Sequence, residues 1–255
     1  MKKHFEHIFE GQIYTTRFDE SANFVAVEVR EAIKKTMKVY LIDVTLGKIN
    51  TEISLDWWDS LVAIAANRII IQTYSTTSST PKVIGITVFD SFAGKKVWEI
   101  AGFTFLENTK NTLTASKQQV EKLPEWQIFD LAEGSLKNGL FEGVKKEDNK
   151  LLFPRKYEEN KPYFADLFQF LYRLLKIEAQ NCIEYLEFEH KVIFSYYIYH
   201  DKQFQNHLLV INRQKEILVH LQLAIAESTS NDTFVMANNT LIVTQNKNHL
   251  IGYDC

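Results

Sequence analysis

The 255-residue sequence contains few of the features that mark specialised classes of protein. It has only two cysteines, Cys182 and Cys255, which are too few for a disulfide framework. No stretch approaches the roughly 18 uncharged apolar residues that a membrane-spanning helix needs. The 32 acidic and 29 basic side chains give a formal charge of −3, and no segment is strongly basic. The composition therefore predicts two free thiols in a reducing cytoplasm, no membrane span and no nucleic-acid partner.

Motifs for cofactors, metals and nucleophiles are also missing from the sequence. The phosphate-binding patterns GxGxxG and GxxxxGK[ST] do not occur, and neither do HExxH, CxxC or GxSxG. Residues 1–10 include two lysines, but glutamates interrupt the segment early and no apolar run follows, which argues against a secretory signal. We therefore expect a cytoplasmic protein with no cofactor, no bound metal and no linear catalytic motif.

The sequence does contain a short unit that returns at a nearly constant interval. In each copy an apolar strand ends in Asp or Asn and a turn follows. The residues that end the strands are Asp43, Asp90, Asp130, Asn212 and Asp254, at intervals of 47, 40, 82 and 42 residues. The interval of 82 is two periods of 41. A period near 40 residues, with several strands in each period, is typical of β-propellers.

The segments between these units are dense in β-branched and aromatic residues, which predicts further strands. The first period supplies strands at residues 13–18, 24–31, 38–44 and 48–55, and the second at 61–66, 68–74, 82–90 and 95–100. Four strands are the content of one propeller blade. We therefore predict an all-β chain, with a single β-propeller domain over residues 1–255 and five to six four-stranded blades.

The fourth period breaks this pattern. An Asp is expected near residue 171, but the apolar residues from 164 to 175 recur at helical spacing, with Pro162 and Asp166 at the start. This spacing favours a helix over 164–176, and a pair of buried strands is the alternative. One blade is accordingly expected to be degenerate or partly helical, or residues 145–180 form an insertion packed on the ring.

The last period has only three strands, at residues 233–237, 240–245 and 249–253. A spare strand, residues 5–13, precedes the first full blade. An open sheet edge leaves N–H and C=O groups unpaired, which is costly and promotes aggregation. We therefore predict that the N-terminal strand completes the last blade and closes the ring.

The second unit, residues 85–98, reads GITVFDSFAGKKVW and resembles the repeat of quinoprotein-type (PQQ-type) β-propellers. In that repeat a strand ends in Asp, which caps the turn, Gly (here Gly94) takes a positive φ, and Trp (here Trp98) packs between blades. Thr51 fills the Trp position in the first unit, and Asn138 or a neighbour fills it in the third. The resemblance implies the fold and not the quinone cofactor, because quinone-dependent dehydrogenases are much larger, exported proteins. The chain is also similar to uncharacterised bacterial propeller-like families of unknown function.

Two adjacent tryptophans, Trp57 and Trp58, lie between Asp56 and Asp59 in the connection from the first blade to the second. Such connections end at the mouth of the central channel, where propellers commonly place ligands. Two indoles with flanking carboxylates could stack a ring or grip a peptide. Alternatively, one Trp packs between blades and the acids cap turns. We take Trp57, Trp58 and Asp59 as the predicted binding residues.

Histidines give weaker signals. His200 precedes an Asp and could do acid–base work, but adjacent strand residues point to opposite faces, so a hairpin turn is the simpler interpretation. His4 and His7 have metal-ligand spacing only on a helix, whereas on a strand they face opposite ways. His207 and His220 are predicted to be ordinary sheet positions.

The absence of a catalytic motif favours a binding or scaffold module that presents one face to a protein or peptide partner. The alternative is an enzyme, a hydrolase or lyase, with carboxylates and histidines gathered at the channel mouth from different blades. Such a site would leave no linear motif, and the fold alone does not decide between the two. A deep pocket of converging charged groups would favour the enzyme, and an exposed apolar patch would favour the binding module.

Overall fold

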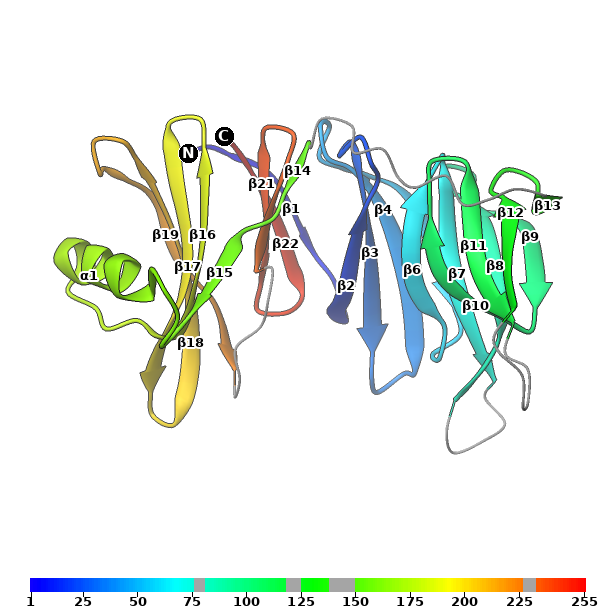
Figure 1. The fold of residues 1–255 in the computed structure, drawn as a ribbon, viewed down its shortest axis with the longest axis horizontal. Helices are drawn as coiled ribbons and strands as arrows, with labels where there is room; N and C mark the ends of the chain where they lie inside the picture. Colours follow the sequence, from blue (N-terminus) through cyan, green and yellow to red (C-terminus); the bar gives the residue numbers. More distant parts are fainter. Residues whose placement is uncertain (76–80, 118–124, 138–149, 227–232) are drawn as a thin grey trace. The chain divides into compact units, whose positions relative to one another are not determined.

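The structure is a computed structural model that describes residues 1–75, 81–117, 125–137, 150–226 and 233–255. Within these ranges the chain forms five antiparallel sheets and one helix (Figure 1). It divides into two compact units, which we describe separately. One consists of residues 9–150, and the other of residues 1–8 together with residues 151–255.

The unit of residues 9–150 contains three four-stranded sheets. The first is formed by β2 (Gln12–Phe18), β3 (Phe24–Glu31), β4 (Thr36–Asp43) and β5 (Lys48–Leu55). The second is formed by β6 (Ser60–Ala65), β7 (Arg68–Ser75), β8 (Lys82–Asp90) and β9 (Lys96–Ala101). The third is formed by β10 (Phe103–Asn108), β11 (Thr112–Lys117), β12 (Glu125–Asp130) and β13 (Leu136–Lys137). Strands that follow one another in the chain are neighbours in the sheet, so each sheet has the size and order predicted for a blade.

The other unit contains two five-stranded sheets. One is formed by β15 (Arg155–Glu158), β16 (Gln180–Phe188), β17 (Lys191–His200), β18 (Gln203–Asn212) and β19 (Ile217–Ala226). The other has the order β1 (Lys3–Ile8), β22 (His249–Asp254), β21 (Thr240–Gln245), β20 (Phe234–Ala237) and β14 (Leu151–Leu152).

The N-terminal strand β1 pairs antiparallel with the C-terminal strand β22, as predicted. Its bounds differ from the expected 5–13, because the chain leaves β22 after Ile8 and already enters β2 at Gln12. The pairing adds the predicted strand, but β14 at the opposite edge makes this sheet five-stranded. The sheet from β15 to β19 also has five strands, so the predicted four strands per blade are wrong for both sheets of this unit. The closed ring and the single domain over residues 1–255 stay predictions.

The predicted helix is confirmed as α1 (Phe164–Leu175), which lies between β15 and β16 in the chain. Its buried residues Phe164 and Leu171 belong to one apolar cluster with Phe194 of β17 and Leu209 of β18. The helix therefore covers a face of the five-stranded sheet and does not replace a blade. Of the predicted insertion over 145–180, residues 145–149 lie outside the described residues.

The Asp-turn unit has the local structure that the sequence predicts. The Asp90 carboxylate accepts hydrogen bonds from the N–H groups of Ala93 (2.8 Å) and Phe92 (3.0 Å), and these bonds lower its pKa. The Gly94 N–H donates to the Asp90 carbonyl, and Gly94 has a φ of +64°. Asp130 caps its own turn in the same way. Local turn chemistry is thus repeated from sheet to sheet.

The turn between β18 and β19 is one residue shorter, since the Lys215 N–H donates to the carbonyl of Asn212 only three places before it. Asn212 replaces the Asp, and its Oδ1 accepts the N–H of Glu216 at 2.9 Å. Lys215 is the last residue of this turn, and its φ is +67°. The glycines that end the three longer turns have φ values of +65°, +64° and +74°. Lys35, Lys202 and Lys247 also have a positive φ, so this conformation is not confined to glycine in this chain.

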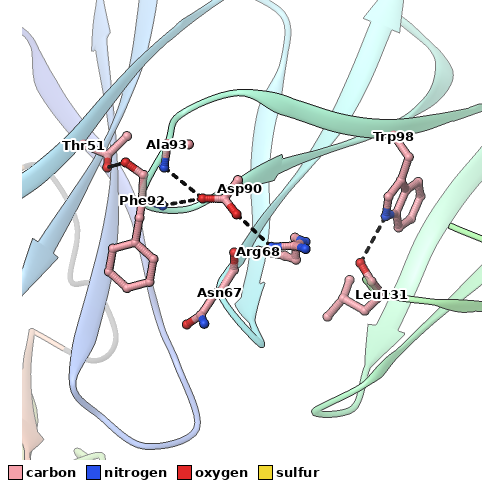
Figure 2. A network of polar contacts seen from close by, with 8 residues as sticks. All are labelled: Thr51, Asn67, Arg68, Asp90, Phe92, Ala93, Trp98 and Leu131. Atoms are coloured by element: carbon pink, nitrogen blue, oxygen red, sulfur yellow. Dashed lines mark hydrogen bonds and ion pairs between the residues drawn. The ribbon is translucent and has the colours of Figure 1, made fainter. Parts of the chain in front are cut away.

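Side chains of the outer strands join neighbouring sheets in the unit of residues 9–150 (Figure 2). Trp98 of β9 donates its indole N–H to the carbonyl of Leu131, in the turn after β12, at 3.0 Å. Thr51 of β5 donates its hydroxyl to the carbonyl of Phe92, in the turn after β8, at 2.9 Å. Trp98 therefore packs between sheets as predicted, and Thr51 makes the equivalent contact one sheet earlier. Asn138, predicted for the third sheet, lies outside the described residues.

We expect Gly134→Ala to destabilise the protein clearly more than Gly102→Ala. The two glycines have similar φ values of +74° and +77°, so both changes add similar backbone strain of about 1–2 kcal/mol. A Cβ on Gly134 would lie 2.6 Å from the Trp98 ring, whereas nothing lies within 4 Å of a Cβ on Gly102. Thermal unfolding of the two variants measures the difference. Equal losses in Tm would show that the Trp98 contact contributes nothing.

Candidate functional site

The connection between β5 and β6, Asp56 to Asp59, is a tight turn. The N–H of Asp59 donates to the Asp56 carbonyl at 3.0 Å, and the Asp59 carboxylate accepts the Asp56 N–H at 3.3 Å. Asp59 is only 7% exposed, and this burial raises the pKa of its carboxyl above the ordinary value. Asp59 therefore caps the turn from the inside, and the connection has a fixed shape.

Arg30 of β3 reaches this connection from a central strand of the first sheet. Its Nη1 donates to the Trp57 carbonyl at 2.5 Å and its Nη2 to the Asp59 carbonyl at 2.6 Å. The guanidinium carbon lies 4.6 Å from the centre of the Tyr14 ring and 5.5 Å from that of the Trp57 ring. Two carbonyls and two aromatic rings thus fix Arg30, and Arg30 in turn fixes the backbone of both residues.

Glu28 of β3 completes this arrangement from inside the protein. It is fully buried, and its Oε1 accepts Arg30 Nε at 2.6 Å. Its Oε2 accepts the N–H of Leu61 in β6 at 2.8 Å. A buried carboxylate is tolerated only with such partners. The Glu28–Arg30 pair therefore joins the first sheet to the second at the point where the connection runs.

The predicted binding residues differ in what they expose. Trp57 is half-buried, and Lys35 Nζ lies 4.7 Å from the centre of its ring. Trp58 is 39% exposed. Tyr14, although it stacks on Arg30, is 69% exposed. We call Tyr14, Arg30, Lys35, Trp57 and Trp58 together the Trp58 surface. Trp58 offers an exposed ring, Trp57 is fixed by cations, and Asp59 points inward.

Glu28 occupies a position that recurs in all five sheets. In each sheet one strand ends in the Asp or Asn of the repeated unit. The residue at this position lies on the preceding strand and pairs with the residue four places before that Asp or Asn. The residues at this position are all polar: Glu28, Gln72, Ser116, Ser195 and Thr244. Gln72 uses it as Glu28 does, because its Oε1 accepts the N–H of Phe105 in the next sheet at 2.8 Å.

Sequence reasoning missed this position because its distance from the turn residue ranges from 10 to 18 residues. The hairpins between the two strands differ in length, so the constant quantity is the pairing register and not a sequence spacing. A search for a polar residue within the most apolar strand of each period would have found it.

The isolated histidines lie largely where the sequence predicts. His200 ends β17, and its ring lies 3.2 Å from the carboxylate of Asp201 in an exposed hairpin turn. His4 and His7 lie on the strand β1, where His4 Nδ1 is 3.3 Å from the Asp254 carboxylate. The strand interpretation of His4 and His7 is confirmed, whereas His200 is the last strand residue before the predicted hairpin turn.

His207 and His220 do more than occupy sheet positions. The Tyr196 hydroxyl lies 2.7 Å from His220 Nε2, and the His207 ring stacks on Tyr196 with 5.5 Å between centres. His207 Nε2 is buried, and within the part of the chain that the structure describes it has no hydrogen-bond partner. Burial lowers the pKa of both imidazoles. The three residues come from β17, β18 and β19, so only the sheet register brings them together.

The described residues offer neither a metal-binding cluster nor a membrane-spanning helix. No group of three or more His, Cys, Asp or Glu among them is placed to hold a metal ion. No helix in the same ranges is long and apolar enough to cross a membrane.

No protein-family model matches the sequence, and the curated proteins contain no match to it. Solved structures do match. The β-propeller domain of the Trilobed protease from Pyrococcus furiosus is 10% identical with a TM-score of 0.38, and the match covers 95% of this chain and 65% of that one. A member of the DUF4221 family from Bacteroides vulgatus is 9% identical with a TM-score of 0.36, and the match covers 99% and 96%. TolB from Acinetobacter baumannii is 13% identical with a TM-score of 0.30, and the match covers 96% and 55%. This chain thus spans less than two thirds of the first and third of these proteins, and none of the likenesses assigns it to a family.

Proposed function

We propose that the chain is a β-propeller of five blades that binds a protein or peptide partner through the Trp58 surface. The observation that carries the proposal is an exposed indole on a connection that Arg30 and Asp59 hold in one shape. Binding then costs little ordering of the backbone, because the connection is preorganised.

The composition of the Trp58 surface supports this role. Trp, Tyr and Arg are the residues most often found to dominate binding energy at protein interfaces. Tyr14 and Trp58 supply exposed rings, and Lys35 adds a positive charge beside Trp57. Such a surface suits a partner segment that carries an acidic residue next to an apolar one.

The fold and the buried acids support the binding module over the enzyme. Five meander sheets and the β1–β22 pairing are what a closed ring of blades requires. Each buried carboxylate already accepts hydrogen bonds from the protein itself. Glu28 accepts them from Arg30 and the Leu61 N–H, and Glu184 from the N–H and hydroxyl of Thr233. Asp59 accepts one from the Asp56 N–H within its own turn. We place this module in the cytoplasm, where Cys182 and Cys255, which form no disulfide, would stay reduced.

The test is a pull-down from native cell extract with the wild-type chain, Trp58→Ala and Trp126→Ala. Trp126 of β12 is 71% exposed and serves as the matched control for loss of an exposed indole. We expect a partner that the wild type and Trp126→Ala recover equally, and that Trp58→Ala recovers at least about tenfold less, the effect of a hot-spot residue. The Tm of each variant is measured alongside, because Trp58 is more covered than Trp126 and its loss must leave the protein folded at the temperature of the pull-down. Equal recovery by Trp58→Ala would remove the proposed surface.

A further inference from the structure

A pocket of about 370 Å³ lies beside α1, within the unit that contains residues 151–255. The volume falls at the lower end of the range for small-molecule sites. Its lining residues come from α1 and from the turn between β18 and β19: Asp166, Gln169, Phe170, Arg173, Leu174 and Lys215. The pocket shares no residue with the Trp58 surface, so a ligand bound in it neither requires nor tests the proposed function.

The helix supplies a continuous lining because its residues recur at helical spacing. Phe170 and Leu174 are four residues apart, one turn of the helix, and form the apolar part. Phe170 also stacks on Phe194 of β17, with ring centres 5.4 Å apart and an angle of 16° between planes. The apolar floor is thereby attached to the sheet and has a defined shape.

Lys215 is the second cation of the lining. It ends the turn between β18 and β19 in a left-handed conformation, which costs about 1–2 kcal/mol. Its Nζ lies 5.9 Å from the centre of the Phe170 ring, so the side chain extends to the pocket.

The charges of the lining define the ligand. Arg173 and Lys215 are cations, and Asp166 is the one carboxylate in the lining. Arg173 Nη2 donates to Gln169 Oε1 at 3.4 Å, which uses one of the five guanidinium donors. A planar guanidinium matches a carboxylate with two parallel hydrogen bonds. The two cations, beside the apolar side chains of Phe170 and Leu174, suit a ligand with one anionic group and an apolar body.

We propose that this pocket binds a small carboxylate with an apolar body. Arg173 and Lys215 bind the carboxylate group, and Phe170 and Leu174 contact the body.

The test measures binding of octanoate, benzoate and phenylpropionate to the full chain by ligand-observed NMR and calorimetry. Phenylpropionamide is the matched neutral control. We expect at least one of the three carboxylates to bind, and the amide to bind at least about tenfold more weakly than phenylpropionate, because it lacks the charge that the two cations recognise. Failure of all three carboxylates to bind at millimolar concentration would overturn the proposal.

Lys215→Gly makes the test specific for the pocket. The variant relieves the left-handed strain at position 215, so its Tm is expected to rise. Binding of the carboxylate is expected to fall about tenfold, while Lys215→Arg keeps it. Because the glycine variant is the more stable protein, unfolding cannot explain its loss of affinity. Unchanged binding by Lys215→Gly would show that the carboxylate binds elsewhere, and it would overturn the assignment.

Discussion

Removal of residues 2–8 is expected to abolish the cooperative unfolding transition and leave an aggregated protein. These residues include the whole of β1, the strand that pairs with β22. Without it, the N–H and C=O groups along the outer edge of β22 have no partners, and an unprotected edge promotes association with other chains. Circular dichroism and size-exclusion chromatography of the truncated chain measure the outcome. A monomer with the Tm of the full chain would contradict it.

A single side chain carries much of this effect. Phe5 is only 7% exposed and lies over Gly252 of β22, where a Cβ would collide with its ring. Phe5→Ala is expected to cost about 3–5 kcal/mol, the usual loss for a buried phenylalanine. Ile8→Ala is the matched control on the same strand, because Ile8 is 71% exposed, and it should change stability by about 0.5 kcal/mol or less. Urea unfolding compares the two variants. Equal losses would mean that the strand is held by its backbone alone.

The parts of this fold that the sequence predicts are those set by local chemistry. Five consecutive residues determine the Asp-turn. The Asp90 carboxylate accepts hydrogen bonds from the N–H groups two and three places ahead, and Gly94 provides the positive φ. The helix α1 is predictable for the same reason, since its apolar residues recur at one helical period. The pairing of β1 with β22 follows from counting strands against the number that a blade needs, although β14 makes this sheet five-stranded.

The parts that sequence reasoning missed or left open depend on contacts between strands and on hydrogen bonds within a turn. Trp57 and Trp58 are adjacent and of the same type. The hydrogen bond from Arg30 to the Trp57 carbonyl fixes Trp57, and Trp58 is left exposed. The inward direction of Asp59 likewise follows from a turn whose hydrogen bonds the sequence does not display. The pairing of Tyr196 with His220 requires the register of three strands. Such contacts join residues that are far apart in the chain, and the hairpins between them vary in length.

Arg30→Met is expected to destabilise the protein by about 3–5 kcal/mol, because it leaves the Glu28 carboxylate buried without its cation. The change also removes the hydrogen bonds to the Trp57 and Asp59 carbonyls, so the Trp58 surface should lose its fixed shape. Urea unfolding at pH 7 measures the loss of stability. Lys35→Met is the control, since Lys35 is exposed and contacts only the face of Trp57 among the interactions described. An equally small effect of both changes would contradict the role given to Glu28.

Adding Glu28→Gln to Arg30→Met is expected to recover part of the lost stability, although each change alone is destabilising. The reason lies at the equivalent position of the next sheet, where Gln72 joins two sheets with a neutral amide. Its Oε1 accepts the Phe105 N–H, and its Nε2 donates to the carbonyls of Gly85 and Phe103. A glutamine at position 28 can accept the Leu61 N–H in the same manner and leaves no buried charge. The double variant should therefore be more stable than Arg30→Met alone, a coupling that a double-mutant cycle measures directly. Strictly additive losses would show that Glu28 and Arg30 act independently, and that the charge of Glu28 is not what Arg30 offsets.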